Sequence, residues 1–322
     1  MKPYKNLLTL KFLHYRLFYI QSYATIIIGA TMSKCFLCPR KCGVDRDKQK
    51  GFCGSDNNLI INKYMLHKWE EPIISGTNGS GAIFFSNCSL KCIYCQNYEI
   101  SSLGNGKNTS VNQLVEIIKQ LEKSGAHNIN FVSPTHYTDH IIQALDIYKP
   151  NIPIVWNTSG YETIETIKKL KNYVDIYLAD FKYFDSELSQ KYSQCRDYFD
   201  FTSKAIKQMK INQPKDIIEN GLMKKGVIIR HLILPNHIED SKKIFDYIKS
   251  NYGNDCYISV MGQYVPYYKA LQDKDICRKL KPLEYKIVES YVKKLGFTNG
   301  FLQDLDSANI CYTPKFNITI DK

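Results

Sequence analysis

Residues 82–95 read AIFFSNCSLKCIYC, an apolar run followed at once by three cysteines, Cys88, Cys92 and Cys95. The apolar run at 82–86 predicts a buried strand, so the thiols are expected in the loop that follows it. Their spacing is C-x3-C-x2-C, and no fourth cysteine follows nearby. Structural zinc sites and ferredoxin-type clusters use four ligands, so this group is one ligand short. An open coordination position is typical of a reactive metal site rather than a structural one.

The chain beyond this loop alternates between strand and helix patterns. The predicted strands are apolar on both faces, as buried parallel strands require. No repeat, low-complexity tract or linker divides residues 80–300. Six strand–helix pairs with right-handed crossovers predict an α/β fold, either barrel-like or open and doubly wound, and we expect a partial (β/α)6 TIM-like barrel. The six strands are expected at 82–86, 128–133, 152–159, 174–182, 226–235 and 256–262.

Polar residues collect where several of these strands end. They lie in SPTHY (133–137), NTSGY (157–161) and DFKY (180–183), and in a fifth strand that carries Arg230 and His231. In parallel α/β folds the chemistry takes place at the carboxyl ends of the strands, so we expect the site there. Successive strand residues point to opposite sides, so only one of Arg230 and His231 can face the interior.

A second cysteine block precedes the strands. Residues 35–53 read CFLCPRKCGVDRDKQKGFC and place Cys35, Cys38, Cys42 and Cys53 at C-x2-C-x3-C-x10-C. Four thiolates close together predict a closed tetrahedral site, and zinc, a single iron or a second [4Fe-4S] cluster fits this ligand set. So short a segment has little core of its own, so a metal would supply its stability. Because its ligands come from another segment, we expect it to be chemically independent of the three-cysteine loop.

The pattern divides the chain into four parts. Residues 32–79 form a cysteine-rich N-terminal segment with a small metal-binding knuckle, residues 80–300 form the barrel, and residues 301–322 form a C-terminal tail. Residues 1–31 carry four Lys or Arg and no acid, and they are too short and polar for a membrane span. They are either a leader of the organellar transit type or the product of a misassigned start, with Met32 as the true one.

Composition limits the class of protein. Lys and Arg number 43 against 31 Asp and Glu, a formal charge of +12, but the cations are scattered rather than gathered between aromatic residues. That distribution argues against a nucleic-acid partner, and no membrane partner is expected. Seven of the 11 cysteines stand at metal-ligand spacings in an enzyme-sized chain, which favours reduced thiols. We therefore expect a cytoplasmic protein, or one of an organellar matrix if residues 1–31 are a transit peptide.

The three-cysteine loop resembles the signature of the radical S-adenosylmethionine (SAM) superfamily, including the aromatic Tyr94 before the last cysteine. Further segments occur in the same order: HKWEEPIISG, GSGAIFFSNCSLKCIYCQN, VSPTHY, NTSGYE, DIYLADFKY, IRHLILP and VMGQYVP. They are similar to the branch related to pyruvate formate-lyase-activating enzyme, particularly its members with an N-terminal cysteine block. The resemblance runs from about Cys35 to Phe301. It implies a [4Fe-4S] cluster, bound SAM, and an electron donor such as flavodoxin or ferredoxin.

The resemblance also implies roles for particular residues. It makes Cys88, Cys92 and Cys95 the cluster ligands. Two departures stand beside this match: an Asn replaces the first residue of an Asp-Thr pair, and SPTHY replaces the Gly-Gly-Glu that binds the methionine amine. The remaining residues implied for cofactor binding are Asp180 and Lys182 of an Asp-x-Lys pattern, Asn157 and Thr158 at the Asp-Thr position, and Ser133, Thr135 or His136 in place of Gly-Gly-Glu.

Two functions from different classes follow. The first is an enzyme that reductively cleaves SAM to a 5′-deoxyadenosyl radical for hydrogen abstraction, either activating a glycyl-radical enzyme or modifying a protein, a peptide or a small molecule. The second is a non-catalytic iron–sulfur or zinc-binding protein for electron transfer or as an adaptor. No catalytic residue is assigned. Glu70 and Glu71 are expected to be solvated, with a role in gating the substrate as the alternative because Trp69 and Pro72 adjoin them. His231 is either a structural histidine or a proton relay.

Overall fold

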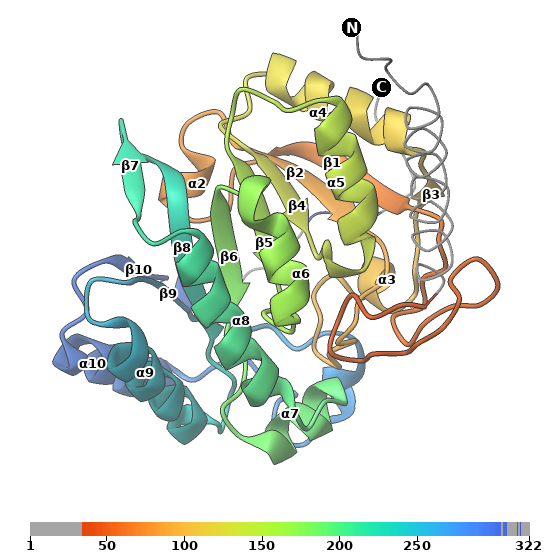
Figure 1. The fold of residues 1–322 in the computed structure, drawn as a ribbon. Helices are drawn as coiled ribbons and strands as arrows, with labels where there is room; N and C mark the ends of the chain where they lie inside the picture. The colour runs from red at the N-terminus through yellow and green to blue at the C-terminus, as the bar shows by residue number, and fades with distance from the viewer. Residues whose placement is uncertain (1–33, 304, 308–313, 315, 317–322) are drawn as a thin grey trace, which may run out of the picture.

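The computed structural model in Figure 1 describes residues 34–303, 305–307, 314 and 316. The leader expected at residues 1–31 lies outside the described residues. No described helix is both long and apolar enough to cross a membrane.

One sheet organises the described chain, in the order β10-β9-β8-β6-β5-β4-β2-β1-β3, with β7 paired to β8. Strands β2, β4, β5, β6, β8, β9 and β10 pair in parallel, whereas β1 pairs antiparallel with β2 and β3. The strands are β1 (Ile60–His67), β2 (Ser80–Phe85), β3 (Lys107–Asn108), β4 (Ile129–Val132), β5 (Ile154–Thr158), β6 (Ile176–Asp180), β7 (Ile217–Glu219), β8 (Leu222–Leu232), β9 (Tyr257–Met261) and β10 (Gly300–Leu302).

The six predicted strands correspond to β2, β4, β5, β6, β8 and β9, so the α/β class and the partial barrel are confirmed. The curved sheet does not close, because β3 and β10 remain at opposite ends of the strand order. It also extends beyond the limits of 80–300, since β1 precedes them and β10 ends at Leu302. The sequence did not predict these flanking strands.

Helices cover the outer face of the sheet, with α4, α5, α6 and α8 forming one layer in Figure 1. Helix α4 illustrates the cause: Ser110 and Gln113 form a capping box at its start, and an apolar stripe that includes Leu114 and Ile118 is buried. The helices are α2 (Pro72–Ser75), α3 (Tyr98–Ser101), α4 (Val111–Lys123), α5 (Thr138–Ile147), α6 (Ile164–Lys169), α7 (Ser186–Ser193), α8 (Tyr198–Asn212), α9 (Ile238–Tyr252) and α10 (Pro282–Leu295). Single 3-10 turns occur at η1 (Thr135–Tyr137), η2 (Leu170–Asn172), η3 (Tyr268–Gln272) and η4 (Leu305–Ser307).

The short helix α2 closes the interior of the barrel from the amino ends of the strands. Its Ile74 is fully buried among inward-facing residues of the parallel strands, including Val155, Ile176 and Ile228. This apolar contact fills the interior at the amino ends of the strands, so the remaining space lies toward their carboxyl ends. The cysteine loop follows β2 at that end, as the sequence predicts.

Candidate active site

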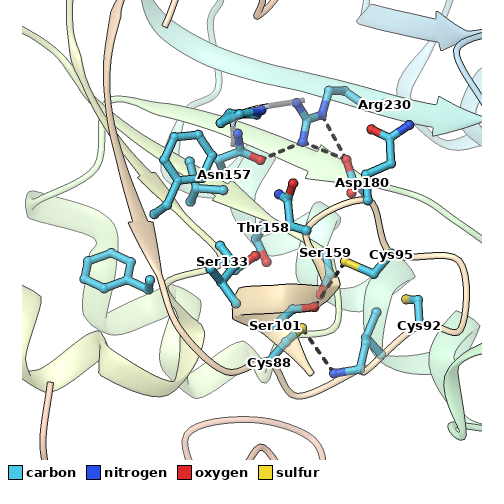
Figure 2. A pocket seen from close by; sticks show the side chains of 18 of the residues that line it. Cys88, Cys92, Cys95, Ser101, Ser133, Asn157, Thr158, Ser159, Asp180 and Arg230 are labelled. Atoms are coloured by element: carbon cyan, nitrogen blue, oxygen red, sulfur yellow. Dashed lines mark hydrogen bonds and ion pairs between the residues drawn. The ribbon is translucent and has the colours of Figure 1, made fainter. Parts of the chain in front are cut away.

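The three thiols of the cysteine loop each accept a hydrogen bond from a different part of the chain. The Leu90 N–H donates to Cys88 Sγ at 3.4 Å, Ser193 Oγ donates to Cys92 Sγ at 2.9 Å, and Ser101 Oγ donates to Cys95 Sγ at 3.2 Å. Donors aimed at sulfur stabilise a thiolate, the form that binds metal. The donors therefore come from three places: the loop itself, the end of α3 and the end of α7. Figure 2 shows the three cysteines and Ser101.

This donor set fits an iron–sulfur cube. Burial raises the pKa of Cys95 to about 12, so a thiolate there needs a compensating positive charge from a bound metal. In a [4Fe-4S] cluster, each cysteine thiolate binds a different iron, so three cysteines can hold three of the four irons. Cys88, Cys92 and Cys95 all line the same cavity, which has a volume of about 240 Å³.

A charged network forms the wall of the cavity beyond the cysteines (Figure 2). Arg230 reaches inward from β8 and donates to Asp180 at 2.9 Å, to Asn157 at 2.6 Å and to Glu70 at 3.1 Å. Lys182 pairs with the other oxygen of Asp180 at 2.6 Å. Burial alone would raise the pKa of Asp180, but the two cations outweigh it and hold that pKa below its usual value. Asp180 is therefore an ionised, fixed acceptor.

Glu70 and Glu71 belong to this network, so the prediction that they are solvated is wrong. Glu71 is only 4 % exposed, and its Oε2 lies 3.8 Å from Arg230 without a hydrogen-bond partner. Burial raises the pKa of both carboxyls, although Arg230 opposes it. These carboxyls are buried because α2 packs into the interior at the amino ends of the strands. Glu70 and Glu71 immediately precede α2, so they lie inside the barrel as well.

The cavity separates the predicted cofactor-binding residues into two groups. Ser133, Asn157, Thr158, Asp180 and Lys182 line it. Thr135 and His136 do not line it, because the η1 turn directs Thr135 to Glu162 and His136 to the Ser86 carbonyl.

The ring of His136 is buried with Nε2 at 2.8 Å from the Ser86 carbonyl, and burial lowers its pKa to about 3. His231 is likewise buried on the outer side of β8, between the Phe181 carbonyl and Ser241 Oγ, at 2.7 and 2.8 Å. Burial lowers its pKa to about 4, so both rings are neutral at pH 7. As predicted, only Arg230 of the 230–231 pair faces the interior.

Glu162 is a buried acid that the sequence interpretation quoted in NTSGYE without giving it a role. Its Oε1 accepts hydrogen bonds from Thr158 at 2.7 Å, Thr135 at 2.8 Å and Trp156 Nε1 at 3.1 Å, while Oε2 is buried without a partner. Burial raises its pKa to about 7. Glu162 thus orients the hydroxyl of Thr158, a residue that lines the cavity. The signal available in the sequence was the presence of a carboxyl four residues beyond Thr158.

The second cysteine block folds into a compact knuckle, residues 34–58, drawn in orange-red in Figure 1. Two of its thiols lie beside Gly51, where an added Cβ would lie 3.5 Å from Cys42 Sγ and 3.6 Å from Cys53 Sγ. The Phe52 N–H donates to Cys42 Sγ at 3.2 Å, and the Ser55 N–H donates to Cys53 Sγ at 3.4 Å.

No three His, Cys, Asp or Glu side chains of the described residues stand close enough to hold a single metal ion as they are. The metal of the knuckle therefore stays a proposal.

Comparison with known proteins defines the family. Residues 82–248, just over half of the chain, match the Radical SAM superfamily. The protein MJ0674 of Methanocaldococcus jannaschii is 35% identical over 258 residues, which cover 76% of this chain and 70% of that protein. The chain therefore belongs to the radical SAM superfamily, and it is a radical SAM enzyme.

Three solved structures show partial similarity to this chain. SuiB of Streptococcus suis bound to the precursor peptide SuiA has a TM-score of 0.47 at 16% identity, over 69% of this chain and 48% of SuiB, so the chain spans about half of that protein. Methylornithine synthase PylB has a TM-score of 0.46 at 14% identity, over 67% of this chain and 68% of PylB. The enzyme anSMEcpe with bound AdoMet and a Cp18Cys peptide has a TM-score of 0.44 at 14% identity, over 66% of this chain and 60% of that one.

Proposed function

We propose that the enzyme holds a [4Fe-4S] cluster on Cys88, Cys92 and Cys95 and binds SAM in the adjoining cavity, for hydrogen abstraction from a second molecule. The observation that carries this proposal is the shared cavity, which has the three hydrogen-bonded thiols on one side and the Arg230–Asp180 pair on the other. When bound and reduced, the cluster supplies one electron that cleaves SAM to methionine and a 5′-deoxyadenosyl radical.

The residues of the cavity have separable tasks in this proposal. Asp180 is ionised and held by Arg230 and Lys182, so it can accept a hydrogen bond from a hydroxyl or an ammonium group of the cofactor. Ser133 and Thr158 present small polar groups from the neighbouring strand ends. Phe84 and Val132 supply an apolar wall, which favours exclusion of water from a radical.

We propose a glycyl-radical enzyme as the first hydrogen donor to test, because the Asp180-x-Lys182 pattern resembles that of the activating enzymes. Modification of a peptide, a protein or a small molecule is the other class that this chemistry serves. The electron donor in this scheme is a flavodoxin or a ferredoxin, as the resemblance implies.

We also propose that Cys35, Cys38, Cys42 and Cys53 bind a second metal, either zinc or iron. Two observations support it: Cys42 and Cys53 both lie beside Gly51, and both accept backbone N–H donors from their own segment. Backbone donors to sulfur are typical of metal-bound thiolates.

The experiment that tests the proposed function is release of 5′-deoxyadenosine by the anaerobically reconstituted enzyme under strong reductant. SAM and a reductant are sufficient for uncoupled cleavage, so the product is expected before the true substrate is known. If reconstituted protein with bound iron releases none, the proposal is wrong and a non-catalytic iron–sulfur role is favoured. Transfer of deuterium from labelled candidate donors into 5′-deoxyadenosine then identifies the substrate.

A further inference from the structure

Arg40 extends from the knuckle into the barrel. Its Nε donates to the Ser89 carbonyl at 2.9 Å, its Nη2 donates to the Ser193 carbonyl at 2.9 Å, and its Nη1 donates to the Gln194 carbonyl. Ser89 follows Cys88 directly in the cluster-binding loop, and Ser193 is the last residue of α7. One side chain of the knuckle therefore joins the cysteine loop to the carboxyl end of a helix, where a cation is favoured.

The knuckle itself fixes the position of this guanidinium. Arg40 stands between Cys38 and Cys42, and its guanidinium carbon lies 3.9 Å from the ring centroid of Phe52, the residue before Cys53. The face-on ring restrains the plane of the guanidinium, and the planar group offers several donors in a fixed geometry. Because Phe52 adjoins Cys53 and Arg40 lies between Cys38 and Cys42, their placement depends on the fold of the knuckle.

Ser193 transmits this placement to the cluster ligand. Its carbonyl accepts from Arg40, while its hydroxyl donates to Cys92 Sγ at 2.9 Å. The same hydroxyl lies 2.7 Å from Tyr183 Oη, which in turn lies 2.7 Å from Tyr94 Oη. Because Ser193 donates to sulfur, it accepts from Tyr183, so a chain of buried hydroxyls ends on Cys92.

We propose that Arg40 is a positioning residue that couples the knuckle to the cluster, by holding Ser193 where its hydroxyl donates to Cys92. A hydrogen bond to a cluster thiolate stabilises the reduced state and raises the reduction potential. The fold of the knuckle, and through it the occupancy of its metal, therefore sets the potential of the cluster in the barrel. This coupling rests on the proposed function, because it requires a cluster at Cys92.

The test is the midpoint potential of that cluster in the reconstituted enzyme, followed by electron paramagnetic resonance. The signal that changes when SAM is added identifies the barrel cluster, whatever metal the knuckle holds. We expect Arg40→Ala to shift the potential to more negative values. Lys41→Ala is the matched control, since it removes the same charge from the next residue, an exposed lysine whose ammonium lies 5.7 Å from the Phe201 ring centroid.

Three further variants separate coupling from general loosening of the fold. Ser193→Ala is expected to lower the potential in the same direction, and the Arg40→Ala/Ser193→Ala double variant should shift it no further than Ser193→Ala alone. Arg40→Lys keeps the charge but loses the fork of donors, so it should behave like Arg40→Ala. If Arg40→Ala does not fold, Arg40→Lys and Ser193→Ala carry the test.

Three results would overturn the coupling: a control-like potential in Arg40→Ala, additive shifts in the double variant, or a wild-type potential in Arg40→Lys. A wild-type enzyme that shows no SAM-responsive signal would instead contradict the proposed function. The two failures are therefore distinguishable in one set of samples.

Discussion

The two cysteine sites are built in different ways. In the barrel loop, Cys92 and Cys95 accept hydrogen bonds from Ser193 and Ser101, residues of other segments that the fold brings close. In the knuckle, the donors to Cys42 and Cys53 are backbone N–H groups within the same short segment. The fold of the barrel therefore positions Cys92 and Cys95, whereas Cys88, like Cys42 and Cys53, has a backbone donor from its own segment. Of the two groups, the barrel thiols alone line the cavity that contains Asp180 and Arg230.

The largest expected effect is loss of SAM cleavage in Cys92→Ala. The proposed cluster would then keep two of its three cysteine ligands, so release of 5′-deoxyadenosine should fall to the background rate of reductant and SAM alone. The assay is product quantification under anaerobic reduction. Cys277→Ala, which changes an exposed cysteine, should keep wild-type turnover. Equal turnover in Cys92→Ala and Cys277→Ala would contradict the assignment of SAM cleavage to the three cysteines of the barrel loop.

Arg230→Met tests whether the hydrogen-bonded network around Arg230 stabilises the barrel site. The substitution leaves Glu70 and Asp180 buried without their shared cation, so we expect a loss of about 3–5 kcal/mol in the free energy of unfolding. Denaturant titration measures it. Lys169→Met breaks an exposed pair with Asp139 and should lose less than about 1 kcal/mol. A loss in Arg230→Met as small as in this control would contradict the role given to the network.

Glu162 predicts a pH dependence of stability within the barrel. Its pKa of about 7 in the fold lies above the value near 4.3 of an unfolded glutamate, so the folded state favours the protonated form. The stabilisation is present below about pH 4.3 and is lost as the pH rises through 7, by about 4 kcal/mol in total.

Denaturant titrations of wild type and Glu162→Gln across this range measure the effect. Glutamine keeps an oxygen that accepts from Thr158 and cannot ionise, so the difference between the two proteins should change with pH in the stated direction. Glu165→Gln, at an exposed position on α6, should track the wild type. A constant difference between wild type and Glu162→Gln would show that Glu162 does not titrate in this window.

The smallest expected effect on cleavage is that of Cys38→Ser. This variant should lose the metal of the knuckle, become sensitive to proteolysis within residues 34–58 and shift the midpoint potential of the proposed barrel cluster. Under excess strong reductant, 5′-deoxyadenosine release should still change less than about twofold, because that cluster keeps its three cysteine ligands. Metal analysis and limited proteolysis check the first part, and the product assay checks the second. Abolished cleavage in a variant that retains the barrel cluster would mean that the two sites form one catalytic unit.

The features that could be predicted from the sequence are those that local patterns of residues determine. The six buried strands, the cysteine loop after the first of them and the inward position of Arg230 follow from apolar runs, spacing and alternation. What it missed depends on contacts between distant segments. The burial of Glu70 requires α2 to fill the barrel from below, and the link from Arg40 to Ser193 joins residues 153 positions apart. The expectation that the two cysteine blocks are independent rested on their separation in the chain, and the contact through Arg40 now qualifies it.

The most direct test of the comparison is the response of the reduced iron signal to SAM in two variants. In Cys38→Ser/Cys53→Ser, about four irons per chain should remain, and their electron paramagnetic resonance signal should change when SAM is added, because the open site is in the barrel. In Cys92→Ala, any signal from the knuckle should not respond to SAM. A SAM-responsive signal in Cys92→Ala, or an unresponsive one in Cys38→Ser/Cys53→Ser, would contradict the assignment of the open, reactive site to Cys88, Cys92 and Cys95.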